Sequence, residues 1–199
     1  MASYKAIAGI SRAIIGHLED NCPTLESTQP DCKLFHPADF ENPSITEGFS
    51  LLLYRVGVNG NLRNLPPRRT LDEGSYRPSL PLDLHYLLTA WATNPERQQR
   101  LLGWAMRFLE DRVILPGNLI NQYLGEDDKD TFRADEAVEF ILDPLSLTDH
   151  FNLWDKLKSK LQVSATYVAR MVMLDSEMEW TSAPLVQSRE IRAREGVTP

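Results

Sequence analysis

A run of apolar residues at every second position between residues 80 and 90 most constrains the fold of this chain. Side chains alternate between the two faces of a β-strand, so residues two apart lie on one face. The apolar side chains in this run are Leu80, Leu82, Leu84, Tyr86, Leu88 and Ala90. The alternation predicts a strand with one face buried in a hydrophobic core.

A helix is predicted directly after this strand. Asn94 offers a side-chain oxygen to cap its first turn, and Pro95 has a backbone angle suited to that turn. Apolar residues then return at helical spacing at Leu101, Leu102, Ala105, Met106, Leu109 and Val113. We expect this helix to end near Leu115, because Pro116 and Gly117 stop helices.

Periodicity predicts further elements on both sides of this strand and helix. Amphipathic helices are expected over residues 4–20 and from Ser146, which can cap the second of them. Strands are expected over residues 33–36, 49–58, 138–142 and 166–174. The last of these is apolar on nearly both faces, as is typical of a strand in the middle of a sheet.

A hairpin is predicted at Asn59 and Gly60, because this dipeptide readily supplies the backbone angles of a tight turn. Its returning strand would cover residues 62–65. Residues 66–78 contain prolines and a Gly-Ser pair, and we expect them to form a loop or an irregular edge.

Length and composition indicate one domain. A chain of 199 residues with 42% hydrophobic content can bury a substantial core. The predicted elements indicate an α+β fold in which a mixed or antiparallel sheet packs with about three helices. We expect this domain to cover residues 1–176, because residues 177–199 are too weakly apolar to build a core and form a C-terminal tail or docking arm.

Charge and hydropathy argue against two classes of partner. The net charge of −7 disfavours a general nucleic-acid binder, since such proteins neutralise phosphates with clustered Lys and Arg. No run of about 20 apolar residues indicates a membrane span, and the N-terminus lacks the pattern of a signal peptide. We therefore expect a cytoplasmic protein, with Cys22 and Cys32 as reduced thiols.

The motifs of the common enzymes are absent from the sequence. There is no GxSxG elbow, no phosphate-binding loop and no GxGxxG. The four histidines fall on four different expected elements, and the acidic run at residues 126–130 lacks the Gly and the closing Glu of a calcium loop. We predict no catalytic residue, no cofactor and no metal site.

Two groups of residues are candidates for a partner interface. Four arginines cluster on the expected hairpin and the loop after it, namely Arg55, Arg63, Arg68 and Arg69. They would form an electropositive strip toward an acidic partner, or equally a solvated hairpin. Sparse apolar residues in the tail would anchor it on a neighbour, namely Trp180, Leu185, Val186 and Ile191.

Two motifs carry a resemblance to a known family. The first is the strand run LPLDLHYLLTAW at residues 80–91, followed by LGWAM at residues 102–106. The second is Leu153 and Trp154, followed by Ser164, Tyr167 and Arg170. Over residues 4–176 the chain resembles the N-terminal domain of the cap, or tail-terminator, proteins of extracellular phage-tail-like contractile injection systems.

The resemblance implies a structural protein without enzymatic activity. Such a cap forms a homo-hexameric ring on the end of the inner tube and sheath, terminates their polymerisation and joins the two. The implied partners are further copies of the chain, the inner tube protein and the sheath protein. Assembly would take place in the cytoplasm, on a particle that can be released. The alternative is a monomeric adaptor or binding module of a phage-like secretion cluster.

Overall fold

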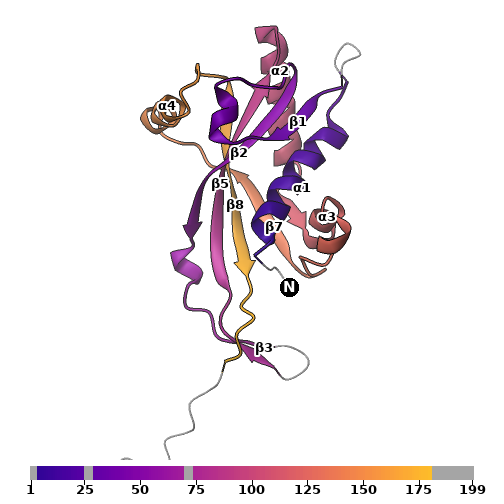
Figure 1. The fold of residues 1–199 in the computed structure, drawn as a ribbon, viewed down its shortest axis with the longest axis vertical. Helices are drawn as coiled ribbons and strands as arrows, with labels where there is room; N and C mark the ends of the chain where they lie inside the picture. Colours follow the sequence, from indigo (N-terminus) through magenta and orange to yellow (C-terminus); the bar gives the residue numbers. More distant parts are fainter. Residues whose placement is uncertain (1–3, 25–28, 70–73, 181–199) are drawn as a thin grey trace, which may run out of the picture.

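A computed structural model describes residues 4–24, 29–69 and 74–180 of the chain. Its centre is a twisted six-stranded sheet of order β1-β2-β5-β8-β7-β6 (Figure 1). Only β1 and β2 pair in parallel, and all other neighbours are antiparallel. The strands are β1 Asp31–Leu34, β2 Gly48–Val58, β5 Leu80–Trp91, β6 Ile114–Pro116, β7 Ala137–Leu142 and β8 Ser164–Leu174.

Helices cover both faces of one half of this sheet. On one face lie α1 Ala6–Asn21, α2 Pro95–Glu110 and the short α3 Gly117–Gln122. On the other face lie α4 Leu147–Lys156 and the 3₁₀-helix η1 Pro37–Phe40. The predicted α+β domain with a mixed sheet is confirmed, with α3 in addition to the three helices expected. None of the helices in the described ranges is long and apolar enough to cross a membrane.

The alternating run at residues 80–90 forms β5, one of the two central strands of the sheet, and builds the larger core. Leu82, Leu84, Tyr86, Leu88 and Ala90 are all buried, packed with apolar residues of α1 and α2. Leu80 differs, because it lies where the strand passes beyond the helices and is 45% exposed. The predicted buried face is therefore confirmed from Leu82 onward.

The opposite face of β5 builds a second core that the alternation did not predict. Leu87 and Trp91 are buried there, and the other members are Phe35, Phe40, Ile45, Leu52, Trp154 and Leu157. The rings of Phe40 and Trp154 meet edge to face with centroids 5.5 Å apart. The indole N–H of Trp91 donates to Ser50 Oγ at 2.8 Å, so its polar atom is satisfied inside the core.

The helix after β5 ends earlier than predicted. Asn94 caps it as expected, accepting from the N–H groups of Glu96 and Arg97, but α2 stops at Glu110. The prediction that it continues to about Leu115 is wrong, because Ile114–Pro116 is strand β6 and pairs with β7. Pairing with β7 thus decides the structure of residues 114–116, although the apolar periodicity of the sequence is compatible with a longer helix. Gly117 then begins α3 rather than stopping a helix.

The predicted hairpin at Asn59 is also wrong. Asn59 has φ −71°, and the residues after it form the 3₁₀-helix η2 Gly60–Leu62 instead of a tight turn. No returning strand follows at residues 62–65, because β2 pairs with β5. Asn59 is held by β5 itself, donating its backbone N–H to Pro81 O at 3.0 Å and its side-chain amide to Asp83 at 3.2 Å.

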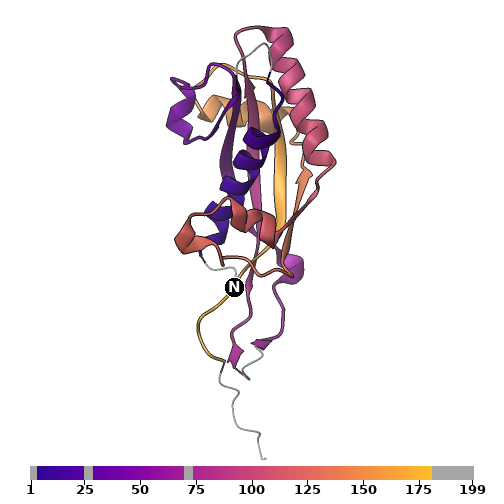
Figure 2. The same cartoon turned by 90° about the vertical axis from the view of Figure 1, so that its right-hand side faces the viewer.

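Strands β2, β5 and β8 extend beyond the helices. Past their ends lies a small two-stranded ribbon of β3 Arg68–Arg69 and β4 Ser75–Tyr76 (Figures 1 and 2). The chain after β8 pairs with β4 in the same ribbon. Trp180 donates its N–H to Ser75 O at 2.7 Å, and Arg77 donates to Met178 O at 3.0 Å. We call this part of the molecule, residues 53–69, 74–83 and 171–180, the projecting end.

The second core gives a test of the fold. Trp91 and Trp154 are 7% and 2% exposed. Replacing either with Ala should lower the free energy of unfolding by about 3–5 kcal/mol, because a large cavity forms. Chemical denaturation measures this, and Trp180→Ala is the matched control, since Trp180 is 46% exposed. Equal losses in all three variants would contradict the assignment of Trp91 and Trp154 to the core.

Candidate partner interface

The projecting end gathers arginines along one stretch of an acidic protein. Five arginines and no acidic residue lie in the described ranges 53–69 and 74–82, whereas the acidic residues of the projecting end, Asp83, Asp175, Glu177 and Glu179, lie after them. Four of these arginines are exposed and form no ion pair with another described residue, namely Arg55, Arg63, Arg69 and Arg77. Exposed arginines that have no ion partner in the described ranges can contact an acidic partner surface.

The structure separates the four arginines that the sequence grouped together. Arg55 lies on β2, Arg63 follows η2 and Arg69 lies on β3, and all three are exposed. Arg68 is different, because its side chain is 11% exposed and its Nε lies 3.5 Å from Oδ2 of Asp175, which is 5% exposed. Arg68 therefore holds the ribbon against the end of β8.

Two further contacts support the pair of Arg68 and Asp175. The Arg68 guanidinium lies over the ring of Tyr76, 5.0 Å from its centroid. Ser79 Oγ donates to Asp175 Oδ1 at 2.6 Å. The ribbon is thus fixed by one mostly buried ion pair and its neighbours, while its other arginines point to solvent.

Arg77 is a candidate that the sequence reasoning missed. It follows β4, and Asp72 and Glu73 separate it from Arg69 in the sequence, so no local signal groups it with the other arginines. Large apolar side chains accompany the arginines on the projecting end. Those exposed by 45–58% are Val56, Val58, Leu80, Met171, Met178 and Trp180. An apolar surface bordered by charge is typical of a protein–protein interface.

Trp180 is the last described residue. Its backbone N–H bonds to Ser75 of the ribbon, and its side chain is half-exposed. Of the predicted tail anchors, Leu185, Val186 and Ile191 lie outside the described residues. Their docking on a neighbour stays a prediction.

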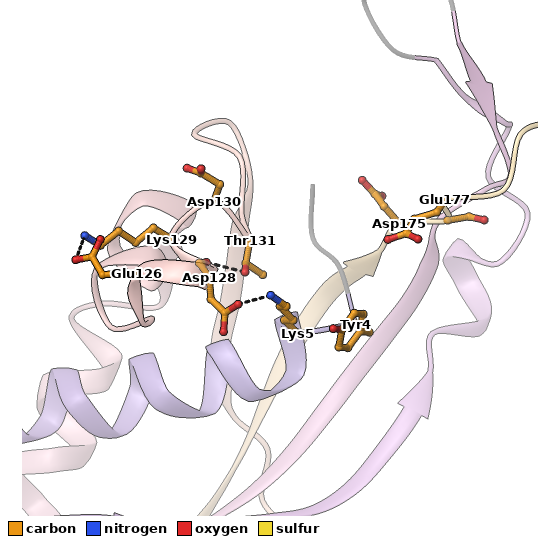
Figure 3. Close-up of a pocket in the computed structure, with 10 residues that line it drawn as sticks. Tyr4, Lys5, Glu126, Asp128, Lys129, Asp130, Thr131, Asp175 and Glu177 are labelled. Atoms are coloured by element: carbon orange, nitrogen blue, oxygen red, sulfur yellow. Dashed lines mark hydrogen bonds and ion pairs between the residues drawn. The ribbon is translucent and has the colours of Figure 1, made fainter.

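A pocket of about 420 Å³ lies between the start of α1, the loop at residues 126–131 and the residues after β8 (Figure 3). Its acidic lining is largely engaged with cations. Lys5 pairs with Asp128, Lys129 pairs with Glu126, and Asp175 is held by Arg68. In the described ranges no three His, Cys, Asp or Glu residues gather as metal ligands.

Neither cysteine has the properties of a nucleophile. Burial is the main cause that raises the pKa of the Cys22 thiol to about 12, and burial together with Glu19 does the same for Cys32. Thiols with such pKa values remain protonated at neutral pH, and the thiolate is the reactive form. The only histidine–carboxylate pair in the described chain joins His85 Nδ1 to Asp143 Oδ2 at 3.1 Å, on the open sheet face.

The ion pair of Arg68 and Asp175 gives a second test. Asp175→Asn leaves the Arg68 charge unpaired in a mostly buried position, which should cost about 3 kcal/mol of ribbon stability. Hydrogen exchange at the amides of Arg77 and Trp180, which bond across the ribbon, measures this loss. Glu177→Gln makes the same chemical change at a nearby exposed residue and should leave exchange unchanged. Equal exchange in the two variants would show that the pair does not hold the ribbon.

The comparisons with known proteins agree with this fold. Residues 9–188 match the family described as the Pvc16 N-terminal domain. The solved structures that share the fold include the PVC sheath/tube terminator of an extracellular contractile injection system in its extended state (TM-score 0.62, 15% identity) and the tube-terminating cap of the anti-feeding prophage (TM-score 0.56, 12% identity). The matches cover 96% and 97% of this chain.

The chain spans 64% and 62% of the lengths of these two structures. No curated protein matches its sequence. The family match covers most of the chain, including the second core, all buried residues of the larger core except Ala6, and the whole projecting end. The chain therefore belongs to the Pvc16 N-terminal domain family.

Proposed function

We propose that this protein is a terminal cap of a contractile injection system. In this role it forms a ring on the end of the inner tube and sheath. The ring is a homo-hexamer, as the resemblance to the cap proteins implies. It terminates the growth of both polymers and joins them. The observation that carries the proposal is the family match over residues 9–188, supported by the shared fold of two terminators.

A structural rather than enzymatic role accords with the chemistry of the side chains. Both thiols have raised pKa values. The acidic pocket has most of its carboxylates engaged with Lys or Arg. A ring is also physically reasonable, because identical head-to-tail interfaces that close leave no free end from which a filament can grow.

In the proposed cap, the projecting end faces another subunit of the particle. Arg55, Arg63, Arg69 and Arg77 meet an acidic rim, and the neighbouring exposed apolar side chains, including Trp180, bury against it. The tail residues Leu185, Val186 and Ile191 extend this contact. Assembly takes place in the cytoplasm, before the particle is released.

Removing the protein tests the cap function. Particles assembled without it should have an uncontrolled length distribution or fail to persist, and supplying the chain in trans should restore uniform length. Negative-stain electron microscopy measures the lengths. A normal length distribution in the deletion would exclude a cap and would favour the monomeric adaptor.

Charge reversal tests the arginine surface. Arg63→Glu combined with Arg69→Glu should lower incorporation into particles at least tenfold while leaving the melting temperature unchanged, because both side chains are exposed and form no ion pair within the described part of the chain. Added salt should weaken incorporation of the parent protein in the same direction. Arg12→Glu is the matched control, since Arg12 is exposed on α1, away from this surface. Equal incorporation of all variants would exclude these arginines from the interface.

A further inference from the structure

The outer edge of β2 is open along its second half. β1 pairs with β2 only from Gly48 to Leu51, and the bond from Phe35 N to Leu51 O adds one more contact. Beyond Leu51, no described strand pairs with this edge of β2 up to Val58 (Figure 1). An exposed strand edge presents backbone donors and acceptors that can pair with another chain.

The direction of the backbone groups identifies which of them are available. Successive residues of a strand point their N–H and C=O groups to opposite sides. Asn59 donates toward β5, to Pro81 O, so Gly57 also faces β5. The backbone groups of Val56 and Val58 therefore point outward, away from the sheet.

The two faces of this edge differ in chemistry. Val56 lies opposite Leu84 and Val58 lies opposite Leu82, on the face of the sheet that carries the larger core. These two leucines are buried, whereas Val56 and Val58 are 47% and 48% exposed. The two valines therefore form an exposed apolar strip at the edge of the core. On the other face, Arg55 lies opposite His85 and is exposed without an ion pair among the described residues.

We propose that the open edge of β2 accepts an extended segment of another chain as an additional strand. Apolar residues of the segment pack on Val56 and Val58, and an acidic residue on its other face meets Arg55. Backbone hydrogen bonds supply affinity in this mode, and alternate side chains supply specificity. The inference deepens the proposed function and rests on it only for the statement that the segment belongs to another subunit of the particle.

Charge selects an acidic segment over a second copy of β2. Pairing two β2 edges antiparallel would bring two Arg55 side chains to the same short stretch of sheet, and like charges across neighbouring strands are unfavourable. Arg63, Arg69 and Arg77 are further exposed arginines of the projecting end, and none of them favours a second basic edge. An acidic residue opposite Arg55 instead gains attraction.

A peptide titration of the isolated protein tests the proposal separately from any particle. The probe is a synthetic peptide of about six residues that alternates Val with Glu, and the matched peptide has Lys in place of Glu. NMR should show shifts of the Val56 and Val58 amides with the acidic peptide, and binding at least tenfold weaker with the basic one. Arg55→Glu should reverse this preference. Equal binding of both peptides, or shifts located elsewhere, would overturn the proposal.

Two proline variants test the need for the outward N–H group. Val56→Pro removes a donor that points away from β5, so the protein should fold and lose peptide binding. Ile114→Pro is the matched control on the opposite sheet edge, where Val113 O accepts from Phe140 N and the Ile114 N–H accordingly points outward. Peptide binding that survives Val56→Pro would contradict strand addition. If Val56→Pro does not fold, the charge swap at Arg55 decides the question.

The same measurements identify other occupants of the edge. Sedimentation that shows a dimer abolished by Val56→Pro would assign the edge to a second copy. Movement of the Val56 and Val58 signals when residues 181–199 are removed would assign it to the chain's own tail. Either result would overturn the proposal. The cap function is tested separately, by the length distribution of particles that lack the protein.

Discussion

The register of β5 between β2 and β8 is the constraint on which the rest of the structure depends. β5 pairs over nearly its whole length on both sides, with a bulge against each neighbour. Its even-numbered residues from Leu82 to Ala90 enter the larger core, and Leu87 and Trp91 enter the smaller one. A shift of one residue would exchange the two faces and place Asp83 and His85 in the larger core.

This register also divides the molecule into two parts. Where β5 runs between α1 and α2 on one face and η1 and α4 on the other, both faces are buried. Beyond the helices, β5 carries Leu80 into solvent, and β2 loses its β1 neighbour. The first part contains both cores, and the second carries exposed arginines, apolar side chains and an open strand edge, which we propose as the surface for partners.

Local signals in the sequence predicted much of the fold. A few adjacent residues are enough to predict the alternation in β5, the Asn94 cap of α2 and the Ser146 cap of α4. The structure confirms all three. The prediction failed where partners distant in the sequence decide the outcome. Strand β6 exists because β7 pairs with it, and Asn59 is held by β5 rather than by a hairpin turn.

The candidate interface was predictable only in part, for the same reason. The clustering of arginines in the sequence identified Arg55, Arg63 and Arg69. Nothing local distinguishes Arg68 from Arg69, because the burial of Arg68 depends on Asp175, more than a hundred positions along the chain. The open edge of β2 likewise follows from the short length of β1, which only the strand pairing reveals.

A reconstruction by cryo-electron microscopy of particles assembled with this chain tests the central claim most directly. We expect density for the chain in a ring at one end of the tube and sheath, with the projecting end buried against a neighbouring subunit and an added strand beside Val56 and Val58. A chain that is absent from the particle end, or that lies there with its projecting end in solvent, would contradict the claim.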